Sequence, residues 1–224
     1  MPLLLGLDVS SLTMSLINIP SPRGAETPLA DSIESALRAV AHLEVERTGD
    51  CVIARTDAGR PERVVVAGHL GTAASVADPM AYVEMGKLFG PGASDAKGAL
   101  AVALKAAAAG GFARDVTFVF HADAQFAPQA ELDRADLLVV AAPTASAVVG
   151  AAADDPLVRR LIELTDVAPT SSGEAYGLAR LASLGAPAVA FGPGDPSVAG
   201  TDGEFVPTAQ LSQCEFVLRS WLQG

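Results

Sequence analysis

Residues 63–72 read RVVVAGHLGT, and this stretch says most about the fold. Its valine run, Val64–Val66, has no polar residue in alternation, which is typical of a strand buried on both faces. A histidine, His69, follows the strand at once. A neutral imidazole there is suited to bind a metal, and it is equally suited to a plain hydrogen bond at a strand end. The stretch therefore predicts a buried strand with a polar side chain at its carboxyl end.

Similar apolar runs and helical patterns alternate on both sides of this stretch. Strands are predicted at 51–56, 63–67, 116–121, 137–141 and 188–191, with a further one at 145–151. Helices are predicted at 26–41, 95–109, 156–164, 174–183 and 208–222. The turn Asp57–Pro61 favours a hairpin between the first two strands, and Ser94 is a candidate helix cap. This alternation indicates an α/β sandwich with a largely parallel sheet.

Ligands bind such sheets outside the carboxyl ends of the strands. Those ends are expected near His69, His121, Ala142 and Gly192. The glycine-rich turn before the helix at 95–109 places Asp95 in a first helical turn, where the helix dipole favours a carboxylate. Simple capping explains Asp95 equally well, and the turn lacks the lysine pattern of a phosphate loop. Three further acidic residues are predicted to lie on a solvated surface: Glu174, Asp202 and Glu204.

Composition limits the classes of protein to which the chain can belong. Half of its 224 residues are hydrophobic, so it can bury a core, and disordered and fibrous classes are excluded. A net charge of -11 argues against a nucleic-acid partner. Two cysteines are too few for a disulfide scaffold, and no apolar run reaches the length of a membrane span. We expect a single domain over residues 1–224, in the cytoplasm, with no membrane partner.

Several short motifs occur along the chain in an order that can be compared with known families. They are Leu12-Thr13, Leu16–Ser21 with Glu26, Gly68–Thr72, Gly92–Gly98, Asp115–Phe120, Ala142–Thr144 and Leu184–Pro196. In this order they resemble the zinc-dependent aminoacylase and succinyl-diaminopimelate desuccinylase family of metallopeptidases, over nearly the whole chain. The resemblance implies a zinc-peptidase-like catalytic domain, a three-layer α/β sandwich with a mixed, mainly parallel sheet.

The chain departs from this family first in its length. The family's catalytic domain is interrupted by a lid and dimerisation domain of about a hundred residues, a size typical of a separate domain. Here Pro143-Thr144 leads through a short segment to the helix at 156–164. The resemblance therefore implies that the lid domain is deleted near 145–155.

The second departure concerns the metal ligands. The family holds two zinc ions with two histidines and three carboxylates. By resemblance His69 matches the first histidine and Asp95 the bridging aspartate, so both are vestigial ligands. The other positions of the family's site fall on residues without its chemistry: Gly71 for an orienting aspartate, Ala124 for the general base, and Gln125, Ala142 and Gly200 for ligands. No catalytic residue is assigned.

His121 and Asp123 offer a way to rebuild a site. Both lie at the end of the strand that carries the lost glutamate pair, and strand alternation puts them on the same side. With His69 and Asp95 they would give two histidines and two carboxylates for one zinc. Alternatively, His121 and Asp123 are ordinary polar residues at a strand end.

Two functions follow as expectations. The first is a non-hydrolytic pseudoenzyme without a cofactor. It would bind a small amino-acid-like ligand, or a protein partner or second copy through the surface that lid loss exposes. The expected ligand cleft comprises Gly71, Thr72, Pro143, Thr144, Gly192 and Gly194. The second is a zinc-dependent amidohydrolase, an N-acyl amino acid deacylase with a remodelled mononuclear site.

Overall fold

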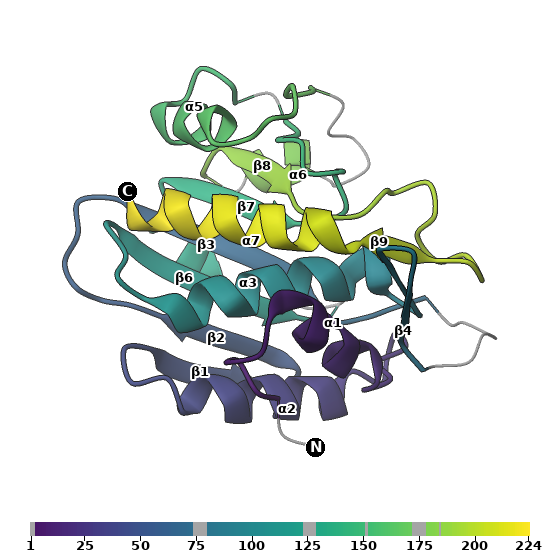
Figure 1. Cartoon of the computed structure of the whole chain (residues 1–224). Helices are drawn as coiled ribbons and strands as arrows, with labels where there is room; N and C mark the ends of the chain where they lie inside the picture. The colour runs from purple at the N-terminus through teal and green to yellow at the C-terminus, as the bar shows by residue number, and fades with distance from the viewer. Residues whose placement is uncertain (1–2, 74–79, 123–128, 151, 172–177, 184) are drawn as a thin grey trace.

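A six-stranded sheet crosses the middle of the molecule in the computed structural model (Figure 1), which describes residues 3–73, 80–122, 129–150, 152–171, 178–183 and 185–224. Its strands are β1 (Glu44–Thr48), β2 (Cys51–Arg55), β3 (Arg63–His69), β6 (Asp115–His121), β7 (Leu137–Ala141) and β8 (Ala188–Phe191). They lie in the order β1-β2-β6-β3-β7-β8. Within the run β6-β3-β7-β8, each strand is parallel to its neighbours. Strand β2 runs antiparallel to both β1 and β6. The prediction of a mixed, mainly parallel sheet is confirmed.

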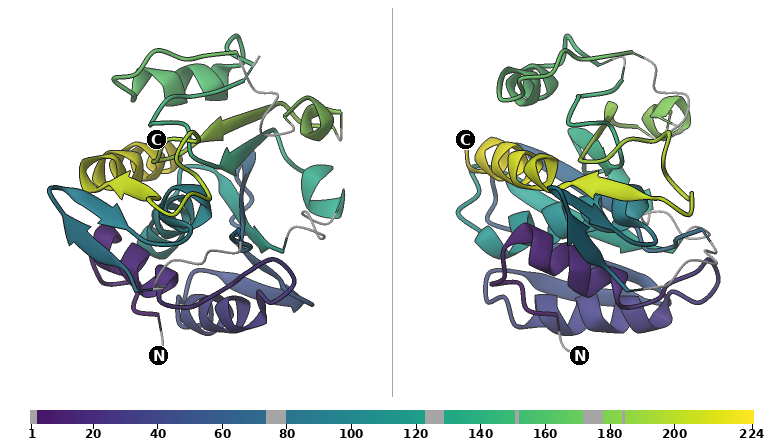
Figure 2. Two further views of the ribbon diagram at one scale, coloured as in Figure 1. Left: turned by 90° about the vertical axis from the view of Figure 1, so that its right-hand side faces the viewer. Right: turned by 45° about the vertical axis from the view of Figure 1, so that its right-hand side comes forward.

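Helices cover both faces of this sheet (Figure 2). On one face lie α1 (Val9–Ile17), α2 (Thr27–Arg38), α3 (Gly98–Ala109), α5 (Pro156–Glu163) and α7 (Thr208–Gln223). On the other face lie α4 (Gln129–Leu132) and α6 (Leu178–Ala182). Each face of the sheet has its own apolar core, and successive residues of a central strand belong to opposite cores. In β3, Val64 and Val66 pack in the core that includes α3, whereas Val65 and Ala67 pack in the core on the other face. The result is the expected three-layer sandwich.

The predicted hairpin between segments 51–56 and 63–67 is wrong, because β6 inserts between β2 and β3. The hairpin partner of β2 is β1, which has no counterpart among the predicted strands, and Gly49 turns between them with a φ of 59°. β1 is a sheet-edge strand of alternating exposure and strongly polar sequence, so it lacks the apolar run that marked the other strands.

Three predicted helices are confirmed, and two other predictions, a helix cap and a strand, are corrected. Helices α2, α5 and α7 match the segments 26–41, 156–164 and 208–222. Ser94 does not cap α3, which begins only at Gly98; the Ser94 hydroxyl instead donates to the carbonyl of Asp195. The predicted strand at 145–151 is absent from its described part, where Val149 makes only isolated bridges. Ala145 and Ser146 have positive φ, which an extended strand does not permit.

A small second sheet lies beside the carboxyl ends of the main strands and was not anticipated. It consists of β4 (Tyr82–Glu84), β5 (Lys87–Phe89) and β9 (Phe205–Pro207), with β5 in the centre. Several large apolar side chains are exposed on or near β4: Met80, Tyr82, Val83 and Met85. By contrast, residues 146–149, at the junction where the family's lid would enter, are buried. No helix in the described ranges is long and apolar enough to span a bilayer.

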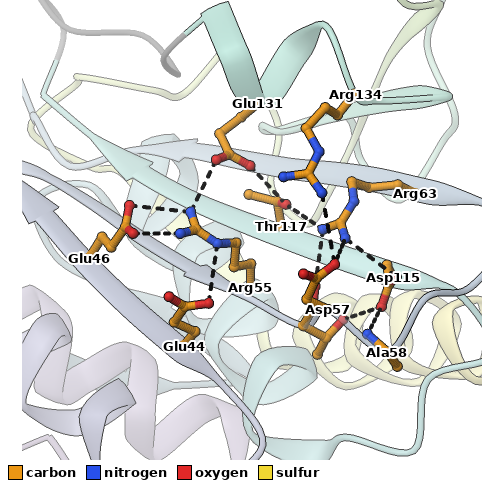
Figure 3. Close-up of polar contacts among 11 residues, drawn as sticks. Glu44, Glu46, Arg55, Asp57, Ala58, Arg63, Asp115, Thr117, Glu131 and Arg134 are labelled. Atoms are coloured by element: carbon orange, nitrogen blue, oxygen red, sulfur yellow. Dashed lines mark hydrogen bonds and ion pairs between the residues drawn. The ribbon is translucent and has the colours of Figure 1, made fainter.

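A buried ion pair fixes the loop that follows β2 (Figure 3). The Asp115 carboxylate accepts the backbone N–H of Ala58 at 2.8 Å and of Arg60 at 3.0 Å. It also accepts the hydroxyl of Thr56 at 3.2 Å and pairs with the guanidinium of Arg63 at 3.3 Å. Burial acts to raise the pKa of Asp115, but these N–H groups and the charge of Arg63 outweigh it, and the pKa lies below its ordinary 3.8.

Replacing Asp115 with Asn is expected to lower the free energy of unfolding at pH 7 by about 2–4 kcal/mol, because Arg63 loses its buried counter-charge. The folded-state pKa lies below the unfolded one. The carboxylate therefore stabilises the fold above about pH 4, and this stabilisation disappears as the pH falls through the folded-state value. Urea unfolding should thus show the difference between wild type and Asp115→Asn shrinking below about pH 4.

The matched control is Asp57→Asn, which removes an exposed partner of the same Arg63. It should change stability by no more than about 1 kcal/mol, as is usual for exposed pairs. Equal losses in both variants would contradict this account of Asp115.

Both cysteines are buried thiols, Cys51 in one core and Cys214 in the other. Burial raises the pKa of Cys51 to about 11 and that of Cys214 to about 12, from an ordinary 9.0. Because the thiolate is the reactive form, neither should react with Ellman's reagent at pH 8 in the native protein. Both should react in guanidinium chloride. Rapid labelling of the native chain would show that a thiol reaches solvent.

Candidate functional site

The carboxyl ends of β3 and β6 bring two histidines together. The two strands are parallel neighbours in a register that pairs His69 with His121, the last residue of each strand. Their ring centroids lie 6.5 Å apart at an angle of 52°. The Nδ1 atom of His121 hydrogen-bonds the carbonyl of Ala122 at 3.1 Å. β7 and β8 end at the same edge, next to Ala142 and Gly192, so the predicted meeting point of strand ends is confirmed.

A tight segment, η1 (Ala93–Lys97), supplies the carboxylate at this edge. Gly92 enters it with a φ of 80°, and a Cβ there would lie 2.5 Å from Cγ2 of Thr72. Asp95 itself is extended, with φ -131° and ψ 99°, rather than helical as the sequence pattern predicts. Its Oδ1 lies 2.9 Å from Nε2 of His69. Two atoms expected to bind a metal therefore bind each other.

A third carboxylate, Glu204, holds this segment in place. It was predicted to be solvated, and that is wrong: the residue is 4% exposed. Its Oε1 accepts the N–H groups of Ser94 and Asp95, both at 2.8 Å. Its Oε2 accepts those of Gly92 at 3.0 Å and Gly200 at 3.2 Å. One side chain thus ties the loop before β9 to the backbone that presents Asp95.

Lys97 anchors the other end of η1 to the chain after α1. Its ammonium donates to the carbonyl of Ile19 at 2.6 Å, and the side chain is almost fully buried. Burial lowers the pKa of Lys97 to about 8, although the charge of Glu204 acts to raise it. This contact joins the Leu16–Ser21 motif to the segment that presents Asp95.

The other positions that the sequence resemblance assigns to family ligands contribute no metal-binding atom in the described structure. Ala142 is 6% exposed and packs in the apolar core, and Gly200 has no side chain. Asp123, Ala124 and Gln125 lie outside the described residues. Among the residues that are described, no three His, Cys, Asp or Glu side chains lie close enough to hold a metal ion. The described residues do not fit the two-zinc site that the sequence resemblance implies.

The residues expected to line a ligand cleft are buried where the loops meet: Gly71, Thr72, Pro143, Thr144, Gly192 and Gly194. The Thr144 hydroxyl donates to the carbonyl of Ala147 at 2.7 Å and accepts the N–H of Gly192 at 3.0 Å. The backbone N–H of Thr72 donates to the carbonyl of Ser21 at 2.9 Å. These contacts bind the loops after β3, β7 and β8 to their neighbours, so the polar groups of Thr72 and Thr144 are already engaged.

Comparison with known proteins finds relatives for part of the chain. No family model matches the chain. A protein of Mycobacterium tuberculosis named for succinyl-diaminopimelate desuccinylase is 41% identical over 116 residues, which are 51% of this chain and 33% of that protein. The succinyl-diaminopimelate desuccinylase of Corynebacterium glutamicum is 43% identical over 95 residues, 42% of this chain and 26% of the relative. The acetylornithine deacetylase of Myxococcus xanthus is 43% identical over 70 residues, 31% of this chain and 18% of the relative.

The chain is a partial homologue of the M20 peptidase family. It spans about a third of the length of the first of these M20 relatives. Solved structures agree on the fold alone. Aminopeptidase PepT of Bacillus cereus superposes with a TM-score of 0.78 at 10% identity, covering 96% of this chain and 97% of that one. Aminopeptidase APDkam598 of Desulfurococcus kamchatkensis gives a TM-score of 0.69 at 10% identity, with coverages of 96% and 95%.

Proposed function

We propose that this M20 homologue is a non-hydrolytic pseudoenzyme that binds a small amino-acid-like ligand at the carboxyl ends of β3 and β6. The observation that carries the proposal is that His69 and Asp95, in contact at 2.9 Å, have no third His, Cys, Asp or Glu side chain close enough among the described residues to hold a metal with them. In a two-metal hydrolase these groups would bind zinc, which lowers the pKa of a water and polarises the scissile carbonyl. Here the family's other ligand positions include Ala142 and Gly200, which have no side-chain lone pairs.

The relatives suggest the class of ligand. Their names refer to a succinylated diamino acid and an acetylated ornithine, both amides with an amino-acid carboxylate. The proposal includes a cytoplasmic location, which the acidic composition and the two unpaired thiols favour. A protein partner or second copy has weaker support, because the apolar residues 147–149 of the junction near 145–155 are buried and the exposed apolar side chains gather around β4.

Zinc content tests the proposal directly. The chain would be saturated with zinc, dialysed exhaustively and subjected to elemental analysis. The pseudoenzyme predicts no retained zinc, because a catalytic zinc normally needs three protein ligands. About one zinc per chain, lost in His69→Ala, would overturn it.

A remodelled mononuclear amidohydrolase is the second candidate, and one observation favours it. The parallel register sets His121 beside His69, with ring centroids 6.5 Å apart. His69, His121 and a carboxylate would satisfy the usual count for one zinc if binding drew them closer together than they lie in the described structure. In that case His121→Ala should lose zinc as completely as His69→Ala. If His121→Ala retains the metal, this candidate fails.

A further inference from the structure

A cavity of about 440 Å³, widely open to solvent, lies at the opposite end of the main sheet from the histidine pair. Its lining comes from the connection between α2 and β1, the loop after β2 and the connection from α3 to β6. It comprises His42, Thr56, Asp57, Ala58, Arg60, Gly111, Phe112 and Arg114. β3 and β6 begin at this end, whereas His69 and His121 mark where they finish (Figure 1). The cavity is therefore separate from the site described above.

Arg114 is a buried guanidinium held on one side only. Its Nε donates to Glu62 at 3.3 Å, its Nη1 donates to the carbonyl of Trp221, and it lies 5.0 Å from the Trp221 ring centroid. These contacts fix a side chain that is 2% exposed. Within the described part of the chain no group accepts a hydrogen bond from Nη2. A fixed arginine with a spare N–H pair beside a cavity is pre-arranged to receive an oxyanion.

Arg60 adds a second positive charge to the lining. Its backbone N–H is used by Asp115, but its guanidinium pairs with no carboxylate in the described ranges. The acidic groups nearby are already neutralised, because Asp57 pairs with Arg63 at 2.9 Å and with Arg134 at 3.8 Å (Figure 3). Asp115 is likewise occupied by Arg63. Glu62 in turn pairs with Arg114 at 3.3 Å. Among the described residues, the charge that these pairs leave over beside the cavity is therefore that of Arg60, although the chain as a whole carries -11.

His42 and Phe112 give the cavity an aromatic wall. Their rings meet edge to face, with centroids 5.9 Å apart at 76°. Nε2 of His42 lies 2.9 Å from the carbonyl of Ala107, and because a carbonyl only accepts, Nε2 carries the hydrogen. That bond orients the imidazole. The cavity thus combines guanidinium donors with an aromatic surface, and its volume falls in the range of small-molecule sites.

We propose that this cavity binds a small organic carboxylate with an apolar body. The carboxylate would bind Arg60 and Arg114, and the apolar body would pack against Phe112 and the ring of His42. The inference does not depend on the proposed function, because it uses none of the residues at the carboxyl ends of β3 and β6.

Isothermal titration with three probes tests the proposal: benzoate, acetate and inorganic phosphate. Benzoate should bind saturably, and acetate at least about tenfold more weakly because it lacks the ring. Arg60→Ala should weaken benzoate at least about tenfold through loss of a charge-assisted hydrogen bond. Since Arg60 is exposed, this variant should fold normally. The matched control is Arg159→Ala on α5, which makes the same charge change at another exposed position and should bind like wild type.

Several results would overturn the proposal. Benzoate that never saturates would exclude the site. Equal affinity for benzoate, acetate and phosphate would show that the cavity binds any anion. That result would reject the proposed contact between an apolar body and Phe112. Binding lost in His69→Ala but kept in Arg60→Ala would place the carboxylate at the other end of the sheet, which would support the proposed function and reject this cavity.

Discussion

Purified protein given N-succinyl-diaminopimelate and saturating zinc should release succinate at least about 10²–10⁴-fold more slowly than a family enzyme. The expected loss of the general base is by itself enough to slow the reaction by this factor. The sequence resemblance puts the family's base position on Ala124, and its ligand positions on residues that include Gln125, Ala142 and Gly200. Loss of the metal would slow the reaction further, because nothing would then activate the water or polarise the amide. Succinate release is the measurement, with N-acetylornithine as the second substrate.

The Corynebacterium glutamicum desuccinylase, assayed alongside, is the positive control for substrate and zinc. Zinc-dependent turnover by this chain, abolished in His69→Ala and kept in Arg159→Ala, would refute the pseudoenzyme. Its dependence on His121 would then show whether the histidine pair forms the remodelled site.

Glu204→Ala is expected to lower the free energy of unfolding by about 3–5 kcal/mol, a larger loss than the one expected for Asp115→Asn. The change leaves four backbone N–H groups without their acceptor, those of Gly92, Ser94, Asp95 and Gly200. Hydrogen bonds to a charged acceptor contribute about 1.5–3 kcal/mol each, but bonds sharing one carboxylate are not additive. Urea unfolding monitored by circular dichroism gives the value.

Two further variants isolate the cause. Glu204→Gln keeps one oxygen acceptor and replaces the other by an amide that donates, so its loss should lie between those of wild type and Glu204→Ala. Asp202→Ala removes an exposed carboxylate two residues away and should change stability by less than about 0.5 kcal/mol. If Asp202→Ala matched Glu204→Ala, net charge rather than the buried hydrogen bonds would explain the effect.

The main sheet and the meeting of its strand ends could be predicted because they depend on local pattern. A run such as Val64–Val66 has no polar side chain to satisfy, so it must lie in the middle of a sheet, and His69 follows at its carboxyl end. The resemblance to zinc peptidases, read from short motifs in order, is likewise confirmed by relatives 41–43% identical over parts of the chain.

The errors arose where partners distant in sequence decide the structure. Glu204 looks like any surface acid, yet its acceptor oxygens serve N–H groups about 110 residues earlier in the chain. The prediction of a hairpin after β2 was wrong for a similar reason. The strand that pairs with β2 on that side is β6, which comes from residues 115–121. One signal was available for Glu204, because it directly precedes the apolar pair Phe205-Val206, where a strand begins.

The insertion of β6 between β2 and β3 has a consequence during synthesis on the ribosome. When residues up to β3 have emerged, both strands carry unpaired edges and cannot pair with each other in the native arrangement. They must wait until residue 121 leaves the exit tunnel, whereas β7 and β8 can then add one after another to the growing edge. The nascent chain is therefore most exposed to aggregation after β3 has emerged and before β6 has emerged. A chaperone that binds extended apolar segments should bind the chain during this interval.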